Sequence, residues 1–267
     1  MSAFDSYANS FEHIKMTRAG GILTVQLHTN GGSLRWGFNP HSELSRAFRA
    51  ISKDRENLVM VLTGTGEEFS GPRASEGVEK GFHSMRAAHW DELHADGMEL
   101  MDSLLSIQAL VIGAVNGPAL RHCELALLSD IVLASDTAEF QDSGHFPNDL
   151  APGDGINVLT AMAMGITRSR YFHLTGQSLS AQKAMDLGLV NEVLPKDQLM
   201  SRAYELAKQL CKQKPNVVRH TRLLFAHELR KKMLELVGYG LALEGMDVAD
   251  AHYEEIAAGS GKASDAH

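Results

Sequence analysis

The stretch "AVNGPALRHCELALLSDIVLAS", residues 114–135, decides the fold class of this chain. An apolar run ends at Gly117, a helix-like segment begins near His122, and a second apolar run follows from Asp130. Two strands joined through a helical segment are typical of a βαβ unit, in which the strands are parallel and the crossover is right-handed. The stretch therefore predicts an α/β fold.

The same alternation continues toward the N-terminus. Strand-like and helix-like runs alternate in the order 21–27, 41–54, 58–64, 90–107 and 110–117. After Gly155 the strand signals fade, and the pattern predicts helices over 155–165, 167–176, 180–188 and 195–213, followed by a pair of helices from Pro215 to about Ala258. We therefore expect a single fold unit with an α/β core over residues 1–195 and a helical region over residues 196–267.

Composition and charge narrow the range of functions. Of the 267 residues, 44% are hydrophobic and 22% are charged, as in an ordinary globular protein. The formal net charge is -8 and no run of Lys and Arg forms a basic stripe, so we expect a small-molecule substrate and no nucleic-acid partner. The N-terminal segment lacks the apolar core of a signal peptide, and no run approaches about twenty apolar residues. We therefore expect a cytoplasmic protein without a membrane partner.

Several common motifs are excluded by their spacing. In "TGTGEEFSG", residues 63–71, Phe69 stands where the third glycine of a dinucleotide fingerprint belongs. The chain contains neither a GxSxG nucleophile elbow nor an HExxH zinc motif. Cys123 and Cys211 lack partners at zinc-binding or redox spacing, so we expect no structural disulfide.

His122 stands, with Arg121, where the helix-like segment of the opening stretch begins. A helix N-terminus offers free backbone N–H groups and a partial positive charge to a developing oxyanion. Alternatively, His122 satisfies the helix end, and Glu124 is a first-turn acid favoured by the helix dipole. The residues by themselves leave both interpretations open.

His145 lies nine residues before Asp154 in "EFQDSGHFPNDLAPGDG", residues 139–155, where prolines and glycines restrict the chain. One hypothesis is that Asp154 fixes the tautomer of His145 and leaves the other ring nitrogen free to activate a water. The alternative is a loop histidine bonded to the backbone. Trp36 in "GGSLRWGF" either packs in the core or forms a pocket wall with an N–H to donate.

Taken together, "VLTGTGEEFSG", the opening stretch, "AEFQD" and "PGDG" resemble the crotonase (enoyl-CoA hydratase/isomerase) superfamily in order and spacing. The resemblance extends from about Phe11 to Ala251. It implies a crotonase-like spiral of ββα units with a helical C-terminal region, assembled as a homotrimer or a dimer of trimers. The apolar segment "VGYGLALEGMDVADA" also favours burial at an interface between subunits.

The chain departs from that superfamily at positions that handle the thioester. The glycine-rich run before "CEL" contains Arg121 and His122, and "FSGPRAS" places Pro72 and Ala74 where crotonases carry glycine and aspartate. Glu124 matches one of the two hydratase glutamates, but a histidine occupies the position of the second. These departures argue against hydration of an enoyl-CoA.

The departures resemble a narrower branch, the β-diketone hydrolases typified by 6-oxocamphor hydrolase. The segments that carry this resemblance are "SLRW", "RH", "FQDSGHFP", "PGDG" and "YGLALE". It implies five catalytic residues, which are Trp36, His122, His145, Asp154 and Glu244. The segment "FSGPRASEGVEKGFH" differs from the "EIDF" that is more usual there, which implies a different substrate pocket.

This resemblance implies hydrolysis of a C–C bond in a cyclic or bicyclic 1,3-diketone by a retro-Claisen reaction. His145, oriented by Asp154, would activate water; His122 and Trp36 would bind the second carbonyl oxygen, and Glu244 would tune the His145 site. No metal or organic cofactor is needed, because the β-carbonyl is the electron sink. The alternatives are a CoA-thioester hydratase or isomerase, supported by the glutamate in "CEL", and a catalytically silent or RNA-binding homologue, which the acidic charge disfavours.

Overall fold

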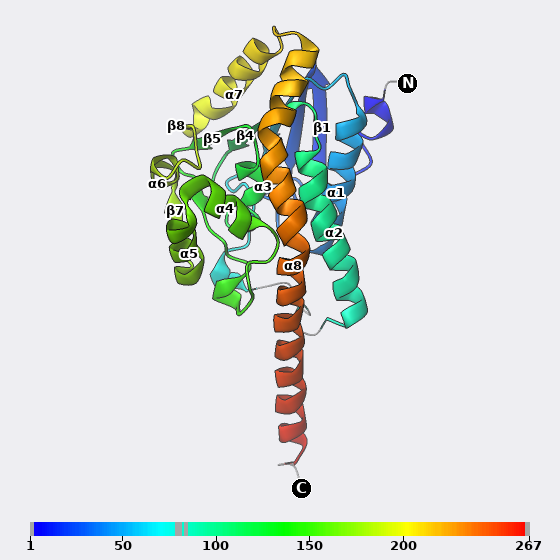
Figure 1. Ribbon diagram of the computed structural model, residues 1–267, viewed down its shortest axis with the longest axis vertical. Coiled ribbons are helices and arrows are strands. Elements are labelled where there is room, and N and C mark those ends of the chain that lie inside the picture. The colour runs from blue at the N-terminus through cyan, green and yellow to red at the C-terminus, as the bar shows by residue number, and fades with distance from the viewer. Residues whose placement is uncertain (1–2, 78–81, 83–84, 265–267) are drawn as a thin grey trace.

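The computed structural model describes residues 3–77, 82 and 85–264, and its centre is a six-stranded sheet (Figure 1). The first two strands of the order β1-β2-β3-β4-β5-β8 are antiparallel, and all the other neighbours are parallel. The strand bounds are β1 (Ile14–Ala19), β2 (Ile22–Leu27), β3 (Val59–Thr63), β4 (Leu110–Val115), β5 (Ile131–Ser135) and β8 (Glu192–Leu194). A two-stranded antiparallel sheet joins β6 (Glu139–Phe140) to β7 (Leu179–Ser180).

The helices surround this sheet. Their bounds are α1 (Phe38–Lys53), α2 (Ala87–Leu105), α3 (Glu124–Leu127), α4 (Ile156–Met164), α5 (Ile166–Thr175), α6 (Ala181–Asp186), α7 (Lys196–Leu210) and α8 (Pro215–Ser264). Figure 1 shows α8 passing beside α2 and then projecting beyond the rest of the fold. No helix within the described residues is both long and apolar enough to cross a membrane.

The central strands are buried on both faces, which explains their continuous apolar runs. Every residue of β3 is buried. Val61 belongs to the cluster that packs against Ala203 of α7, whereas Leu62 lies in the larger cluster that contains Phe48 of α1. The alternation of strands and helices in the sequence therefore predicted the layered α/β core correctly.

The expected pair of helices after Pro215 is wrong, because α8 is continuous through Gly238 and Gly240. Both glycines lie where the helix is closely packed. A side chain at Gly238 would contact Met98 of α2, and one at Gly240 would collide with the backbone of Gly153. Tertiary packing therefore offsets the low helix propensity of glycine here.

Four strands lie outside the expected positions, namely β1, β6, β7 and β8. The last three contain only two or three residues, too few for an alternating pattern to be visible. Strand β8 nevertheless extends the sheet by pairing with β5. Strand β1 pairs with β2 across a turn at Gly20 and Gly21, which have φ angles of 58° and 81° that favour glycine.

Candidate active site

A cavity of about 290 Å³ lies among the loops that follow β3, β4 and β6. All five residues that the sequence singled out line it, namely Trp36, His122, His145, Asp154 and Glu244. The rest of the lining is largely apolar and includes Phe38, Trp90, Leu93, Leu150 and Leu241. An apolar cavity with a few convergent polar groups is typical of a small-molecule site.

Close contact between two glycines brings the last of these residues to the others. The backbones of Gly153 and Gly240 approach so closely that a Cβ atom on either would collide with the other. Asp154 follows the first glycine, and Glu244 lies one helical turn after the second. The motifs "PGDG" and "YGLALE" are therefore the two sides of one contact, which places both carboxylates at the cavity.

The carboxylate at hydrogen-bond distance from the ring of His145 is Asp142, whereas the sequence led us to expect Asp154 there. The Nδ1 atom of His145 lies 2.5 Å from Oδ1 of Asp142, whereas Nε2 lies 3.6 Å from Oδ2 of Asp154. Asp142 is three residues before the histidine in the loop after β6, so its side chain reaches the near side of the ring. Asp154 instead lies on the cavity side of that ring.

Two carboxylate oxygens face Nε2 of His145 without accepting a hydrogen bond. They are Oδ2 of Asp154, at 3.6 Å, and Oε2 of Glu244, at 3.8 Å. Both side chains are buried, and the other oxygen of Asp154 accepts the backbone N–H of Ile156 at the start of α4. Buried polar atoms without partners are costly, and their concentration at one cavity indicates that a ligand or water completes them.

Burial and charge shift the proton affinities of these groups in different directions. Burial lowers the pKa of His145, but the charges of Asp142, Asp154 and Glu244 outweigh it, so the pKa lies well above its ordinary value. Burial raises the pKa of Glu244 to about 7, and the negative charge of Asp154 contributes to this increase. Near neutral pH the carboxyl group of Glu244 is therefore about half protonated.

His122 adopts a backbone conformation that is unusual for a residue with a side chain. Its φ angle is 52°, in the left-handed region that favours glycine. This is the position at which the resembled family carries a glycine-rich run, so the histidine retains the turn despite its strain. Its ring packs against the indole of Trp36 with the ring centroids 3.9 Å apart.

Two carboxylates lie near Nδ1 of His122. Oε1 of Glu124 lies 2.5 Å from this nitrogen, and Oδ2 of Asp154 lies 3.2 Å from it. The carboxyl group of Glu124 is fully buried and does not line the cavity. Burial raises the pKa of Glu124, although the neighbouring His122 opposes this increase.

The geometry around His122 does not fit a metal ion. His122, Glu124 and Asp154 place one ligand atom each within 4.8 Å of one another. The 2.5 Å contact between the first two is a hydrogen-bond distance, however, whereas ligands about 2.0–2.1 Å from one ion lie roughly 3 Å apart or more. The group is better described as a hydrogen-bonded pair with a second carboxylate, that of Asp154, 3.2 Å from Nδ1 of His122.

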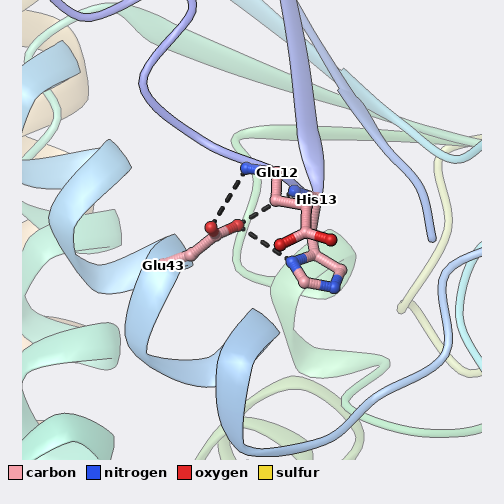
Figure 2. A group of neighbouring side chains, drawn as sticks. All are labelled: Glu12, His13 and Glu43. Atoms are coloured by element: carbon pink, nitrogen blue, oxygen red, sulfur yellow. Dashed lines mark hydrogen bonds and ion pairs between the residues drawn. The ribbon is translucent and has the colours of Figure 1, made fainter. Parts of the chain in front are cut away.

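A second group of acidic residues and a histidine, which comprises Glu12, His13 and Glu43, lies away from the cavity (Figure 2). Glu43 of α1 accepts the backbone N–H groups of Glu12 and His13 at 3.0 and 2.9 Å, and its Oε2 atom lies 3.0 Å from Nδ1 of His13. Both carboxylate oxygens are occupied. This group therefore ties the start of β1 to α1.

Several residues of the site were missed in the sequence. Asp142 lies in the quoted loop, but nothing in its spacing distinguishes it from Asp149. His41 and Trp90 line the cavity, and each has a buried ring nitrogen without a partner. Burial, together with the nearby His122, lowers the pKa of His41 to about 3, so its ring is neutral. In the sequence, His41 and Trp90 are marked only by their positions in the segments that form α1 and α2.

The loop that departs from related sequences is described only in part. Pro72 and Gly77 line the cavity, while residues 78–81 and 83 lie outside the described residues. Arg121 fixes the described part, because its guanidinium donates to the carbonyl of Gly77 at 2.8 Å and to Ser143 Oγ at 3.0 Å. It therefore links this loop to the loop that carries His145.

The chain matches the enoyl-CoA hydratase/isomerase family over residues 22–241, and it belongs to that family. A probable enoyl-CoA hydratase of Mycobacterium tuberculosis is 34% identical over 175 residues, which are 62% of this chain and 60% of that protein. The chain thus spans less than two thirds of that relative. A probable peroxisomal enoyl-CoA hydratase of Arabidopsis thaliana is 31% identical over 79% of this chain and 75% of its own.

Solved structures add a relative from a different branch. A β-diketone hydrolase from the cyanobacterium Anabaena sp. PCC 7120, bound to (S)-3-oxocyclohexyl acetic acid, has a TM-score of 0.87 and 39% identity, covering 94% of this chain and 98% of its own. An enoyl-CoA hydratase/isomerase from Mycobacterium paratuberculosis has a TM-score of 0.82 and 25% identity over 92% and 97% of the two chains. The crotonase fold and the resemblance stated from the sequence are confirmed.

Proposed function

We propose that this protein is a cofactor-independent hydrolase that cleaves a C–C bond of a cyclic or bicyclic 1,3-diketone by a retro-Claisen reaction. One observation carries the proposal. His145 is held at Nδ1 by a buried carboxylate, and its Nε2 atom faces the cavity beside two carboxylate oxygens that accept no hydrogen bond. The likeness to the β-diketone hydrolase of Anabaena supports the same class of substrate.

In the proposed reaction, a water molecule occupies the space between Nε2 of His145 and the free oxygens of Asp154 and Glu244. Separations of 3.6 and 3.8 Å are too long for direct hydrogen bonds, but a water can bond to both sides of such a gap. The neutral ring takes a proton from this water at Nε2 as the water oxygen adds to one carbonyl carbon. The product of this step is a tetrahedral oxyanion beside an imidazolium.

The oxyanion then collapses to a carboxylic acid and breaks the bond to the carbon between the two carbonyl groups. The electron pair of that bond moves onto the second carbonyl, which becomes an enolate. Nε2 of His122 and the indole N–H of Trp36 would donate to the enolate oxygen, where charge develops. The proton held by His145 then returns to carbon, so the net reaction consumes one diketone and one water and gives one keto acid.

The second candidate is a hydratase or isomerase acting on a CoA thioester, which the names of the curated relatives favour. The position of Glu124 counts against it. This glutamate, which matches a hydratase glutamate in the sequence, is fully buried, contacts His122 and does not line the cavity. In the present geometry it cannot reach a substrate.

Separate incubations with a bicyclic 1,3-diketone and with crotonyl-CoA test the proposal. We expect loss of the diketone with formation of one keto acid, and no change in the absorbance of the enoyl thioester. Glu124→Gln is the control for the hydratase alternative, because it removes the glutamate that a hydratase needs and keeps a hydrogen-bonding side chain next to His122. We expect this variant to retain diketone cleavage. Hydration of crotonyl-CoA without any diketone cleavage would overturn the proposal in favour of the second candidate.

We also propose that the protein is cytoplasmic and assembles as a homotrimer or a dimer of trimers. Exposed apolar side chains on α8 support the assembly, since Leu224 and Phe225 are 78% and 81% exposed and Tyr239 and Met246 are also exposed. Analytical ultracentrifugation tests it, with a single species of three or six subunits as the expected result. A monomer at micromolar concentration would contradict it.

A further inference from the structure

Behind His145 lies a chain of buried polar groups, of which the proposed reaction uses only the first, Asp142. Asp142 contacts Nδ1 of His145 through Oδ1 at 2.5 Å and Nδ1 of His173 through Oδ2 at 2.8 Å. Nε2 of His173 lies 3.0 Å from Oγ1 of Thr160, which lies 2.7 Å from Oγ of Ser169. All five side chains are buried. The chain therefore connects the catalytic histidine to α4 and α5.

We infer that Asp142 is the positioning residue of His145 and that His173 fixes Asp142 in turn, while Asp154, whose Oδ2 atom lies 3.2 Å from Nδ1 of His122, faces the cavity. The catalytic meaning of this inference rests on the proposed function. The hydrogen-bonding arrangement is tested without turnover.

The two contacts of Asp142 restrain its carboxylate. Each oxygen accepts from a different imidazole, so rotation of the carboxylate plane would break both bonds. An acceptor at Nδ1 requires that His145 keep its proton on that nitrogen. The nitrogen that exchanges protons during a reaction is then Nε2, which is the one that faces the cavity.

His173 is as firmly held as Asp142. It lies on α5, 31 residues along the chain, and its second nitrogen contacts Thr160 of α4. That hydroxyl also lies 2.8 Å from the carbonyl oxygen of Ile156, within the same helix. Second-layer hydrogen bonds of this kind commonly hold a catalytic ring in its productive orientation.

The electrostatic environment agrees with this geometry. Burial would raise the pKa of Asp142, but His145 and His173 outweigh burial and hold it well below its ordinary range. The other charged groups around His145 are Asp154 from the loop before α4, Glu244 from α8, the His122–Glu124 pair at α3, and Arg121 near Asp142. Asp142 is in direct contact with the ring, whereas the nearest oxygens of Asp154 and Glu244 lie 3.6 and 3.8 Å from it.

Histidine-selective ¹⁵N NMR on the full chain without substrate tests the arrangement. The chain contains 13 histidines, so a spectrum of His145→Gln identifies the signals of His145 by difference. As the pH is raised, we expect His145 to lose its Nε2 proton and keep its Nδ1 proton. If His145 instead loses its Nδ1 proton first, the inference is overturned. This outcome is measured on the unmodified protein, so it does not depend on whether any variant folds.

Two matched substitutions compare the effects of Asp142 and Asp154 on the titration of His145. Asp142→Asn removes the charge in contact with Nδ1, so we expect the titration of His145 to move to lower pH. Asp154→Asn should move it less, because that carboxylate lies 3.6 Å from the ring. The opposite ranking would assign the orienting role to Asp154 and overturn the inference. Because neither measurement requires a substrate, failure of the proposed function would leave this result intact.

Turnover of the diketone tests the role of His173. His173→Asn can restore a donor to Asp142 from its Nδ2 atom, whereas His173→Phe keeps a ring but has no donor. We expect His173→Phe to lower kcat about 10-fold or more with little change in KM, and His173→Asn to recover a large part of the loss. Equal rates for the two variants would show that the hydrogen bond does not matter.

His13→Gln is the control for these experiments, because it alters a similar contact between a histidine Nδ1 and a carboxylate away from the cavity. It should leave the His145 signals and the turnover rate unchanged. If His145 titrates as expected but no diketone is cleaved, the positioning role stands and the proposed function fails.

Discussion

Two contacts between a histidine and a carboxylate, one at the cavity and one away from it, show what distinguishes a reactive site from a structural one. Nδ1 of His145 lies 2.5 Å from Asp142, and Nδ1 of His13 lies 3.0 Å from Glu43 (Figure 2). Both pairs join a histidine to an acidic residue on the same ring nitrogen. Their surroundings differ.

In the contact away from the cavity, both oxygens of the Glu43 carboxylate have partners. Glu43 accepts two backbone N–H groups in addition to the ring contact, and those bonds outweigh the effect of burial and lower its pKa below the ordinary value. At the cavity, Asp154 and Glu244 each keep a buried oxygen without a hydrogen bond. The difference indicates that satisfied groups hold the fold together, whereas unsatisfied groups are available to a ligand.

Replacing the cavity histidine should have the largest effect. His145→Gln removes the group that accepts the proton of water, so we expect kcat for a bicyclic diketone to fall about 10²–10⁴-fold. His13→Gln removes the histidine that contacts Glu43 away from the cavity, and this change should leave kcat within about twofold of the unmodified protein. Steady-state rates of keto acid formation measure both. Near-normal turnover by His145→Gln would exclude this residue as the base.

The donors proposed for the second carbonyl oxygen should have the next largest effect. His122→Phe and Trp36→Phe each keep an aromatic ring in the stack between these residues but remove an N–H. Loss of one donor to a developing oxyanion costs roughly 10²–10³-fold in kcat. We therefore expect a fall of about this size for each variant. The melting temperature should fall for His122→Phe, which leaves the buried Glu124 without its partner, and should change little for Trp36→Phe. A change confined to KM would show that these residues bind the substrate without stabilising the enolate.

The sequence predicted the parts of this site that lie in short motifs. All five residues that the resemblance implied line one cavity, and each lies in a short segment that carries the resemblance. The buried strands were also predictable, since apolar runs between turn signals leave few alternatives. The central sheet and the position of the site thus follow from local patterns.

The second contact of Asp142 could not be predicted, because it joins distant segments of the chain. Asp142 and His173 are 31 residues apart and meet only after α4 and α5 have packed. Asp154 has the same chemistry and lies in a more restricted loop, so the sequence favoured it as the partner of His145. A similar limit applies to α8, whose continuity through Gly238 and Gly240 depends on packing with α2 and Gly153.

Stability measurements on variants of Glu244 and Glu43 compare the cavity with the His13–Glu43 contact. The pKa of Glu244 is about 7 in the folded protein, above the ordinary value of 4.5, so between these values the unfolded chain releases its proton first. Folding is therefore penalised as the pH rises through this window, by on the order of 3 kcal/mol above it. Glu244→Gln should remove this penalty and stabilise the protein at about pH 8 but not at about pH 4, as followed by urea denaturation.

Glu43→Gln is the matched variant for that measurement. Its amide would turn a donor toward one of the backbone N–H groups that Glu43 now binds, so we expect a loss of about 1 kcal/mol at pH 8. The two substitutions should thus shift the urea midpoint in opposite directions. A loss of stability in Glu244→Gln at high pH would show that the ionised carboxylate is well solvated or paired, contrary to its burial.

The pH dependence of turnover should show the smallest of these effects. The pKa of His145 lies well above its ordinary value, so below that pKa the neutral ring is a minor form. We expect kcat/KM to rise with pH by up to tenfold per unit until the ring is neutral, with a midpoint above about 6.5. Rates of diketone loss from about pH 6 to pH 9 measure it. A rate that falls over this range would mean that the imidazolium acts as an acid, and that the carboxylate of Asp154 takes the proton from water.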